Sequence, residues 1–146
     1  MLLLTAALTC GAEEKEWKLV WSDEFTADGR PDEATWSFEQ GFVRNHEDQW
    51  YQAENAWQED GLLIIEGRRE HRPNPTYRSE GRHWGQQRSD ISYTSASLNT
   101  GGKFEFCYGR MEVCARIPTA GGAWPAIWPL YSKHARQIAI GLNVVV

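Results

Sequence analysis

Gly61-Leu62-Leu63-Ile64-Ile65-Glu66-Gly67 is the stretch of sequence that decides the fold class. Four consecutive Leu and Ile residues stand between two glycines, and Glu59-Asp60 just before them is a turn signal. A short apolar run bounded in this way is typical of a β-strand. Because polar residues do not alternate within the run, the pattern predicts a strand that is buried on both faces.

Short strand-like runs occur on both sides of this stretch, separated by turn residues. They cover residues 17–21, 49–52, 91–98, 104–106 and 110–117. In the last run every second residue is apolar, from Met111 to Ile117, which predicts a strand with one buried face. Residues 70–90 are polar and hold two prolines, so we expect a long surface loop there. Many short strands with turns between them predict an all-β fold, a β-sandwich.

Length and composition limit the number of domains and the classes of function. A chain of 146 residues suffices for one domain. It has 15 Lys and Arg against 20 Asp and Glu, with no basic cluster, which argues against a nucleic-acid-binding protein. Its eight Trp residues can serve in a sandwich core or as platforms for sugar rings, and composition does not distinguish the two.

Residues 1–10 predict an export segment. They are apolar or small and give way to charged residues, and the run is too short to span a bilayer. The sequence ALTC at 7–10 is similar to a bacterial lipoprotein cleavage site with Cys10 as the lipid-bearing residue; an ordinary signal peptide is the alternative. We therefore expect a protein that is secreted or lipid-anchored at the cell envelope. In such a protein Cys107 and Cys114 could form a disulfide. No His or Cys cluster has metal-ligand spacing, so no metal site is predicted.

Four segments in a fixed order between residues 17 and 130 carry a resemblance to a known family. They are residues 19–25 (LVWSDEF), 45–51 (NHEDQWY), 108–113 (YGRMEV) and 121–128 (GGAWPAIW). In this order they resemble the amino-terminal half of glycoside hydrolase family 16, the laminarinase and lichenase group. The resemblance implies a jelly-roll sandwich of the concanavalin A type, incomplete in this chain, with a cleft for a β-1,3 or β-1,3-1,4 glucan. It implies no cofactor and no protein partner; some relatives carry a structural calcium ion, which the sequence itself does not support.

The resemblance also implies a mechanism. Hydrolysis with retention needs a nucleophilic carboxylate and an acid carboxyl about 5 Å apart. The family places them on one strand, in a Glu-x-Asp-x-Glu or Glu-x-Asp-x-x-Glu run that follows the segment matching residues 121–128. No Glu of this chain is followed two residues later by Asp, and no acidic residue follows Glu112. We therefore predict no catalytic residue here and expect an inactive chain from an enzyme family.

Three residues stay as candidates for binding the sugar. Trp124 and Trp128 resemble tryptophans of the family's cleft, and residues four apart in a strand share a face. Packing in the core is the alternative for each ring. Asn45 matches a family position whose amide is expected to bind sugar hydroxyls, and an Asn that caps a loop is the alternative. Glu47 and Arg110 could assist in the cleft or be members of structural ion pairs.

Residues 131–146 resemble nothing in the family and end in an apolar run. One hypothesis is a shifted reading frame, because the degenerate codons of residues 140–145 permit Trp-Pro-Gln-Cys-Gly, similar to the run that precedes the family's catalytic Glu. A natural truncation and a partial gene model are the alternatives. The sequence thus divides into an export segment (1–10), a partial family-like domain (17–130) and a tail (131–146).

Overall fold

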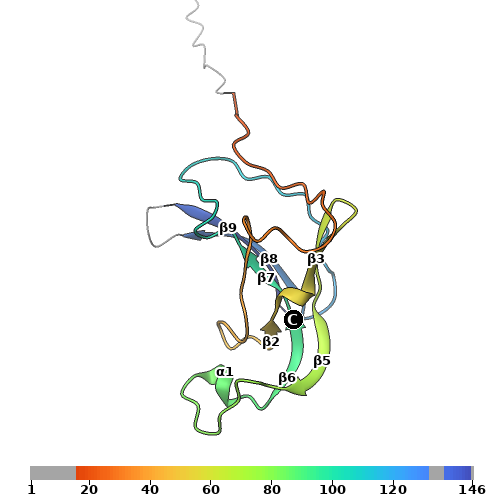
Figure 1. Cartoon of the computed structure of the whole chain (residues 1–146), viewed down its shortest axis with the longest axis vertical. Coiled ribbons are helices and arrows are strands. Elements are labelled where there is room, and N and C mark those ends of the chain that lie inside the picture. The colour runs from red at the N-terminus through yellow and green to blue at the C-terminus, as the bar shows by residue number, and fades with distance from the viewer. Residues whose placement is uncertain (1–15, 132–136, 146) are drawn as a thin grey trace, which may run out of the picture.

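A computed structural model describes residues 16–131 and 137–145, and almost all its regular elements are strands (Figure 1). The described residues form one 3-10 turn, η1 (Ala53–Asn55), and one short helix, α1 (Trp84–Gln87). Neither could cross a membrane, and no longer helix occurs in the described part. The strands are β1 (Ser37–Phe38), β2 (Gln49–Tyr51), β3 (Ala56–Glu59), β4 (Leu62–Ile65), β5 (Arg68–Pro73), β6 (Asp90–Ser95), β7 (Ser97–Asn99), β8 (Trp124–Tyr131) and β9 (Ile138–Val145). The predicted all-β class is confirmed, and the export segment with Cys10 lies outside the described residues.

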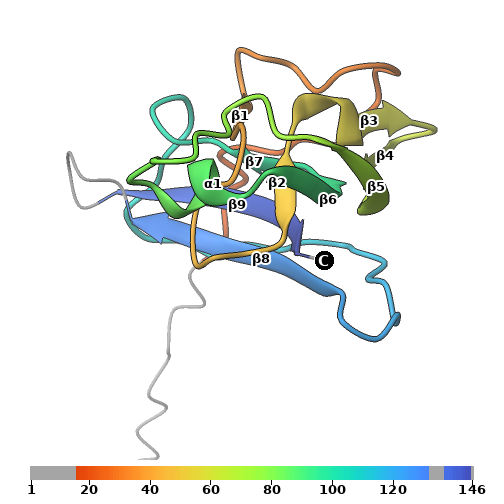
Figure 2. The same cartoon turned by 90° about the horizontal axis from the view of Figure 1, so that it is seen from below.

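The strands form three sheets. The largest has the strand order β1-β7-β9-β8, the second β2-β6-β5, and the third is the β3-β4 hairpin. Only β2 and β6 pair in parallel; the other described pairs are antiparallel. Figure 2 shows β8 and β9 along the lower side of the molecule, with β3, β4 and β5 above them.

Strands β6 and β7 join two of these sheets. Only Ala96 separates them, so residues 90–99 run almost continuously from the three-stranded sheet into the four-stranded one. The strand predicted over residues 91–98 is therefore confirmed, although the structure divides it into β6 and β7, which belong to different sheets. This passage brings β2, the partner of β6, close to β9, the partner of β7.

The four-stranded sheet has one apolar and one polar face because side chains alternate along each strand. On the apolar face, Leu98 and Ile140 belong to a buried cluster with Trp36, and Leu63 and Ile65 pack against it. On the opposite face the paired residues Ser97 and Asn143 are polar. We call this side, which carries Ser97 and Asn143, the polar face.

The stretch that decides the fold class forms a strand, but its predicted burial is wrong. Residues 62–65 are β4, as expected. However, Leu62 is 60% exposed, and none of the four residues is fully buried. The reason is that β4 pairs only with β3 in a two-stranded hairpin, so neighbouring strands do not enclose it.

Two predicted strands are absent from the structure, and the prediction of a third, over residues 104–106, is also wrong, because this segment forms only the isolated bridge Phe106↔Ile138. Residues 110–117 and 17–21 have no strand conformation, and their side chains are largely exposed, with Val113 at 49% and Leu19 at 77%. Neither segment has a neighbouring strand to complete a hydrogen-bonded ladder. Apolar alternation alone does not supply that partner, so both predictions are wrong.

The long loop predicted over residues 70–90 is also partly wrong. Its first part belongs to β5, which pairs with β6 through its backbone although its side chains are polar. Its last part contains α1, whose start is capped by His83, which accepts a hydrogen bond from the Gly85 N–H at 3.2 Å. The residues between these two elements (74–83) and the two before β6 (88–89) are irregular.

Most of the segment after residue 131 that the structure describes is regular. Strand β9 lies between β7 and β8 and pairs with β8 from Trp124↔Val145 to Tyr131↔Ile138. The apolar run is thus a central strand of the largest sheet. The hypotheses on the origin of this segment stay predictions.

Candidate functional site

The candidate site is built around four polar side chains at every second position of one segment: Asn45, Glu47, Gln49 and Tyr51. The first two lie in a turn in which the Glu47 N–H donates to the Arg44 carbonyl at 3.1 Å. Asn45 has a φ of +54°, in the left-handed region that Asn tolerates better than most residues. The last two lie in β2, and the alternation directs these side chains to one side of the chain.

The carboxylate of Glu47 is the centre of this cluster. It accepts hydrogen bonds from Asn45 Nδ2 at 3.2 Å, Gln49 Nε2 at 2.9 Å and the Tyr51 hydroxyl at 3.0 Å. Asn45 is exposed while Tyr51 is fully buried, so the network runs from solvent into the interior. The three donors fix the orientation of the carboxylate.

Tyr51 connects the cluster to the polar face of the four-stranded sheet. Its hydroxyl accepts from Gln49 Nε2 at 2.7 Å and from Asn143 Nδ2 of β9 at 3.0 Å. Burial, together with the charge and hydrogen bond of Glu47, raises the pKa of Tyr51 to about 12. Asn143 Oδ1 is buried and has no hydrogen-bond partner in the described part of the chain.

Arg44 joins Tyr51 to Trp128. Its guanidinium forms an ion pair with Glu39 and lies 5.6 Å from the ring centre of Tyr51 and 5.4 Å from that of Trp128. Burial acts to lower the pKa of Arg44, but the hydrogen bond and charge of Glu39, helped by Tyr51 and Glu47, outweigh it and leave the pKa raised. Glu39 also accepts from the Ser97 hydroxyl at 2.5 Å.

A second arginine, Arg88, anchors the turn from the other side. It pairs with Asp48 at 2.8 Å, donates to the His46 carbonyl at 3.2 Å, and lies over the rings of Phe42 and Trp84 at 5.1 and 5.2 Å. The short helix α1 therefore helps to hold the turn that carries Asn45 and Glu47.

The two candidate tryptophans lie on one face of β8. Trp124 is 72% exposed, whereas Trp128 is partly buried under Arg44. Four residues of a strand separate them by about 13 Å. Trp128 stands opposite Gly141 in the register, and its ring covers that glycine.

The contact between Trp128 and Gly141 leads to a first prediction. A Cβ at position 141 would lie 2.6 Å from Cε2 of the Trp128 ring. We expect Gly141→Ala to displace this ring from Arg44 and to lower the free energy of unfolding by about 1–2 kcal/mol. Chemical denaturation and near-ultraviolet circular dichroism check this. Gly121→Ala, which meets no atom within 4 Å, is the matched control. An unchanged aromatic signal in Gly141→Ala would contradict the prediction.

The structure brings most of the predicted site residues together. Asn45 and Trp128 are linked through Glu47, Tyr51 and Arg44, and Trp124 lies further along β8 on the same face. Arg110 is not part of the site, because it forms an ion pair with Glu112 in the exposed segment. Sequence reasoning missed the contributions of Glu39, Arg44, Gln49, Tyr51 and Asn143. The polar alternation from residue 45 to 51 was a signal for two of these, Gln49 and Tyr51.

The arrangement combines indole rings with oriented amide and carboxylate groups. Both carboxylates of the cluster are engaged, Glu39 with Arg44 and Ser97, and Glu47 with its three donors. Among the described residues, no three His, Cys, Asp or Glu side chains could together hold a metal ion. Cys107 and Cys114 are exposed free thiols, so the suggested disulfide is not formed in this structure. Aromatic surface beside planar polar groups is suited to sugar rings and their hydroxyls.

An all-β fold with an aromatic and polar face of this kind belongs to the β-sandwich class. Comparison with known proteins identifies the family. The chain is 44% identical over 123 residues to a β-glucanase of Rhodothermus marinus, covering 81% of this chain and 37% of the relative. It is similar in structure to SCLam, a non-specific endo-β-1,3(4)-glucanase of family GH16, with a TM-score of 0.64, 33% identity and coverage of 82% and 44%. The chain belongs to glycoside hydrolase family 16, whose jelly-roll domain it matches over part of its length.

Two further findings concern how much of the family's proteins this chain represents and which other proteins it is similar to. No family model matches the chain. A solved structure from work on endo-acting O-glycanases with which human gut bacteria initiate mucin breakdown has a TM-score of 0.72 and 37% identity, with coverage of 80% of this chain and 43% of that one. The chain thus spans 37% to 44% of the length of these three proteins.

Proposed function

We propose that this chain binds a β-1,3 or β-1,3-1,4 glucan on the polar face, through Trp124, Trp128 and Asn45. The observation that carries the proposal is the 72% exposure of Trp124 on the same face as Trp128. An exposed indole at that place offers a flat apolar surface for a sugar ring. Asn45 supplies an amide at the solvent end of the Glu47 network, where it can meet sugar hydroxyls.

The names of the relatives support the choice of polymer. The Rhodothermus protein is a β-glucanase and SCLam is an endo-β-1,3(4)-glucanase. The structure from the work on mucin breakdown makes a mucin glycan the rival polymer, which belongs in the same binding experiment. The apolar export segment at residues 1–10 supports binding outside the cell, with Cys10 as a lipid-bearing residue in the anchored form.

We infer further that this chain does not cleave the polymer. A retaining glycosidase needs one carboxyl as acid and one carboxylate as nucleophile about 5 Å apart. The 146 residues contain no Glu-x-Asp run, and Glu39 and Glu47 are both engaged in the cluster. The chain would then be a catalytically silent member of a hydrolase family. The alternative is a dedicated carbohydrate-binding protein with the same sandwich.

Replacing Trp124 by Ala tests the proposed binding. We expect the affinity for laminarin to fall about tenfold, because losing a ring that stacks on a sugar removes about 1–2 kcal/mol of apolar contact. Affinity electrophoresis in laminarin, mixed-linkage glucan and mucin checks the size of the loss and the choice of polymer. Trp17→Ala, which removes an indole that is 67% exposed in a segment outside the site, is the matched control.

The same preparations test the absence of cleavage. We expect no release of reducing ends from laminarin by the parent chain. Turnover that persists through purification would contradict the proposed inactivity. Unchanged affinity of Trp124→Ala for all three polymers would contradict the proposed binding face.

A further inference from the structure

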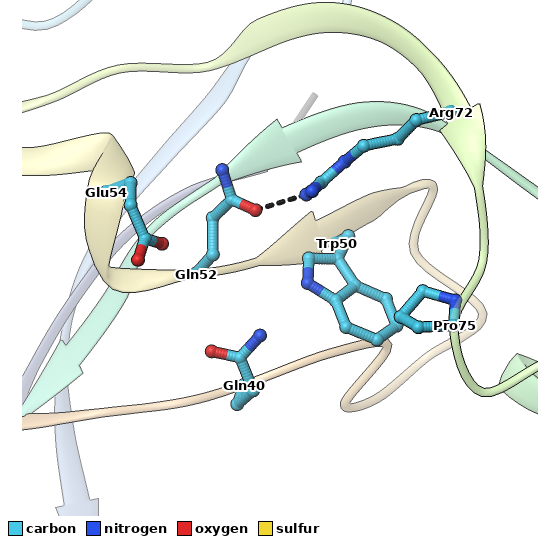
Figure 3. A pocket seen from close by; sticks show the side chains of 6 residues that line it. All are labelled: Gln40, Trp50, Gln52, Glu54, Arg72 and Pro75. Atoms are coloured by element: carbon cyan, nitrogen blue, oxygen red, sulfur yellow. Dashed lines mark hydrogen bonds between the residues drawn. The ribbon is translucent and has the colours of Figure 1, made fainter.

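A hollow on another side of β2 has the chemistry of a second sugar-binding site. We call it the β2 hollow; it has a volume of about 320 Å³ and is lined by Gln40, Trp50, Gln52, Glu54, Arg72 and Pro75 (Figure 3). In β2, Trp50 stands between Gln49 and Tyr51, so its side chain points to the opposite side of the strand. The β2 hollow is therefore separate from the cluster around Glu47.

The floor of the β2 hollow is held in place by contacts within the chain. Trp50 is 6% exposed and packs edge-on against Phe42, with the ring centres 5.4 Å apart. Gln52 donates to Asn55 Oδ1 at 2.7 Å and accepts from Arg72. Arg72 also pairs with Glu70 at 3.3 Å. The amide and the guanidinium are thus fixed before any ligand arrives.

The rim of the β2 hollow has unused hydrogen-bonding groups. The side chains of Gln40 and Glu54 form no hydrogen bond or ion pair with any other described residue. In Figure 3 they lie beside Gln52 at one end of the hollow, and Arg72 lies toward the other. An amide can both donate and accept, and a carboxylate can accept two hydroxyl groups. These are the partners that adjacent hydroxyls of a sugar ring require.

Charge excludes most ionic ligands from the β2 hollow. Glu54 is an anion and Arg72 a cation, so the lining residues have no net charge. A phosphate or sulfate would meet the carboxylate, and a cation would meet the guanidinium. A neutral ligand rich in hydroxyl groups fits both.

A neighbouring hollow extends the surface. It shares Gln40, Trp50 and Pro75 with the β2 hollow, has a volume of about 330 Å³, and continues past Thr76, His83 and Gln86. Its additional side chains include a hydroxyl, an imidazole and an amide, which all take part in hydrogen bonds. The two hollows adjoin at Trp50, so together they suit an oligomer with several similar units better than a single small molecule.

We propose that the β2 hollow and its neighbour form a second binding site for a neutral oligosaccharide, separate from the polar face. A chain with two sugar-binding sites on different sides of β2 would hold a polysaccharide at two points. The effective concentration at the second point then raises the affinity for the polymer above that for a short oligosaccharide.

The test uses a β-1,3-linked glucose hexamer in isothermal titration calorimetry. Gln40→Ala/Glu54→Ala removes the two unpartnered rim groups, and neither takes part in a contact that the fold uses. Glu24→Ala removes another exposed carboxylate without a partner among the described residues and is the charge-matched control. We expect two hexamer sites in the parent chain; Trp124→Ala should weaken one of them about tenfold and leave the other unchanged. Adding Gln40→Ala/Glu54→Ala to Trp124→Ala should weaken the other site at least tenfold.

The two proposals fail in different ways in this experiment. Hexamer binding that is the same in Gln40→Ala/Glu54→Ala as in the parent overturns the second site, whatever Trp124→Ala does. The absence of any binding in Trp124→Ala also overturns it, while supporting the polar face. Two sites that both keep the parent's affinity in Trp124→Ala would instead overturn the proposed role of the polar face. Circular dichroism of each variant shows that it keeps the parent fold.

Discussion

Replacing Trp36 by Ala is expected to lower the free energy of unfolding by about 3–5 kcal/mol, the usual loss for a large buried aromatic side chain. Trp36 is 1% exposed and belongs to the main apolar cluster. Its ring centre lies 6.2 Å from that of Trp21 and 6.3 Å from that of Phe25. Its indole N–H donates to Asp23 Oδ2 at 2.8 Å, so the substitution also leaves a carboxylate oxygen without its donor.

Chemical denaturation followed by far-ultraviolet circular dichroism measures this loss, because the signal does not depend on the tryptophan removed. Trp36→Phe separates the two contributions: it retains most of the packing and removes the hydrogen bond. It should therefore cost less than Trp36→Ala. Trp17→Ala is the control, and as a surface substitution it should change stability by no more than about 0.5 kcal/mol. A loss below about 1 kcal/mol in Trp36→Ala would show that this cluster is not the core.

A run predicted from the sequence formed a strand only where a partner strand is present. The run at residues 62–65 and the run at 91–98 formed strands, since β3 pairs with the first and β2, β5 and β9 pair with the second. The alternating run at 110–117 had an equally clear pattern and formed none. Alternation reports which side chains could share a face, but a strand also needs a neighbour whose backbone completes the ladder. That neighbour is not encoded within the run itself.

The candidate site was also predictable only in part. The family resemblance supplied Asn45, Trp124 and Trp128, and the structure links Asn45 with Trp128. The residues that make this link were not predicted, because their contacts join distant parts of the chain. The hydrogen bond from Asn143 to Tyr51 spans 92 residues, and no local pattern indicates it. Arg44 was missed for the same reason, since Trp128, the ring that it covers, lies 84 positions further along the chain (128 minus 44).

A second large effect is expected in alkaline solution, where Tyr51 should make the fold unstable. The pKa of Tyr51 is about 12 in the folded chain, chiefly because of burial and then because of Glu47, against about 10 for an exposed tyrosine. Below pH 10 the hydroxyl is protonated in both states, and stability does not depend on it. Between pH 10 and 12 the unfolded chain releases the proton while the folded chain keeps it, so the free energy of unfolding falls. Two pH units correspond to a loss of about 2.7 kcal/mol.

Tyr51→Phe isolates this contribution from other groups that titrate in the same range. Near neutral pH the variant should be less stable than the parent by about 1–3 kcal/mol, because Gln49 and Asn143 lose the acceptor they share and Glu47 loses a donor. The difference should shrink or reverse by pH 12, since only the parent carries the group that resists ionisation when folded. Urea denaturation of both chains at pH 8, 10 and 12 measures the difference directly. If it were constant over this range, the Tyr51 hydroxyl would titrate as it does in the unfolded chain. It could then be neither buried nor held against Glu47, and the link from Asn45 to β9 that organises the polar face would not exist.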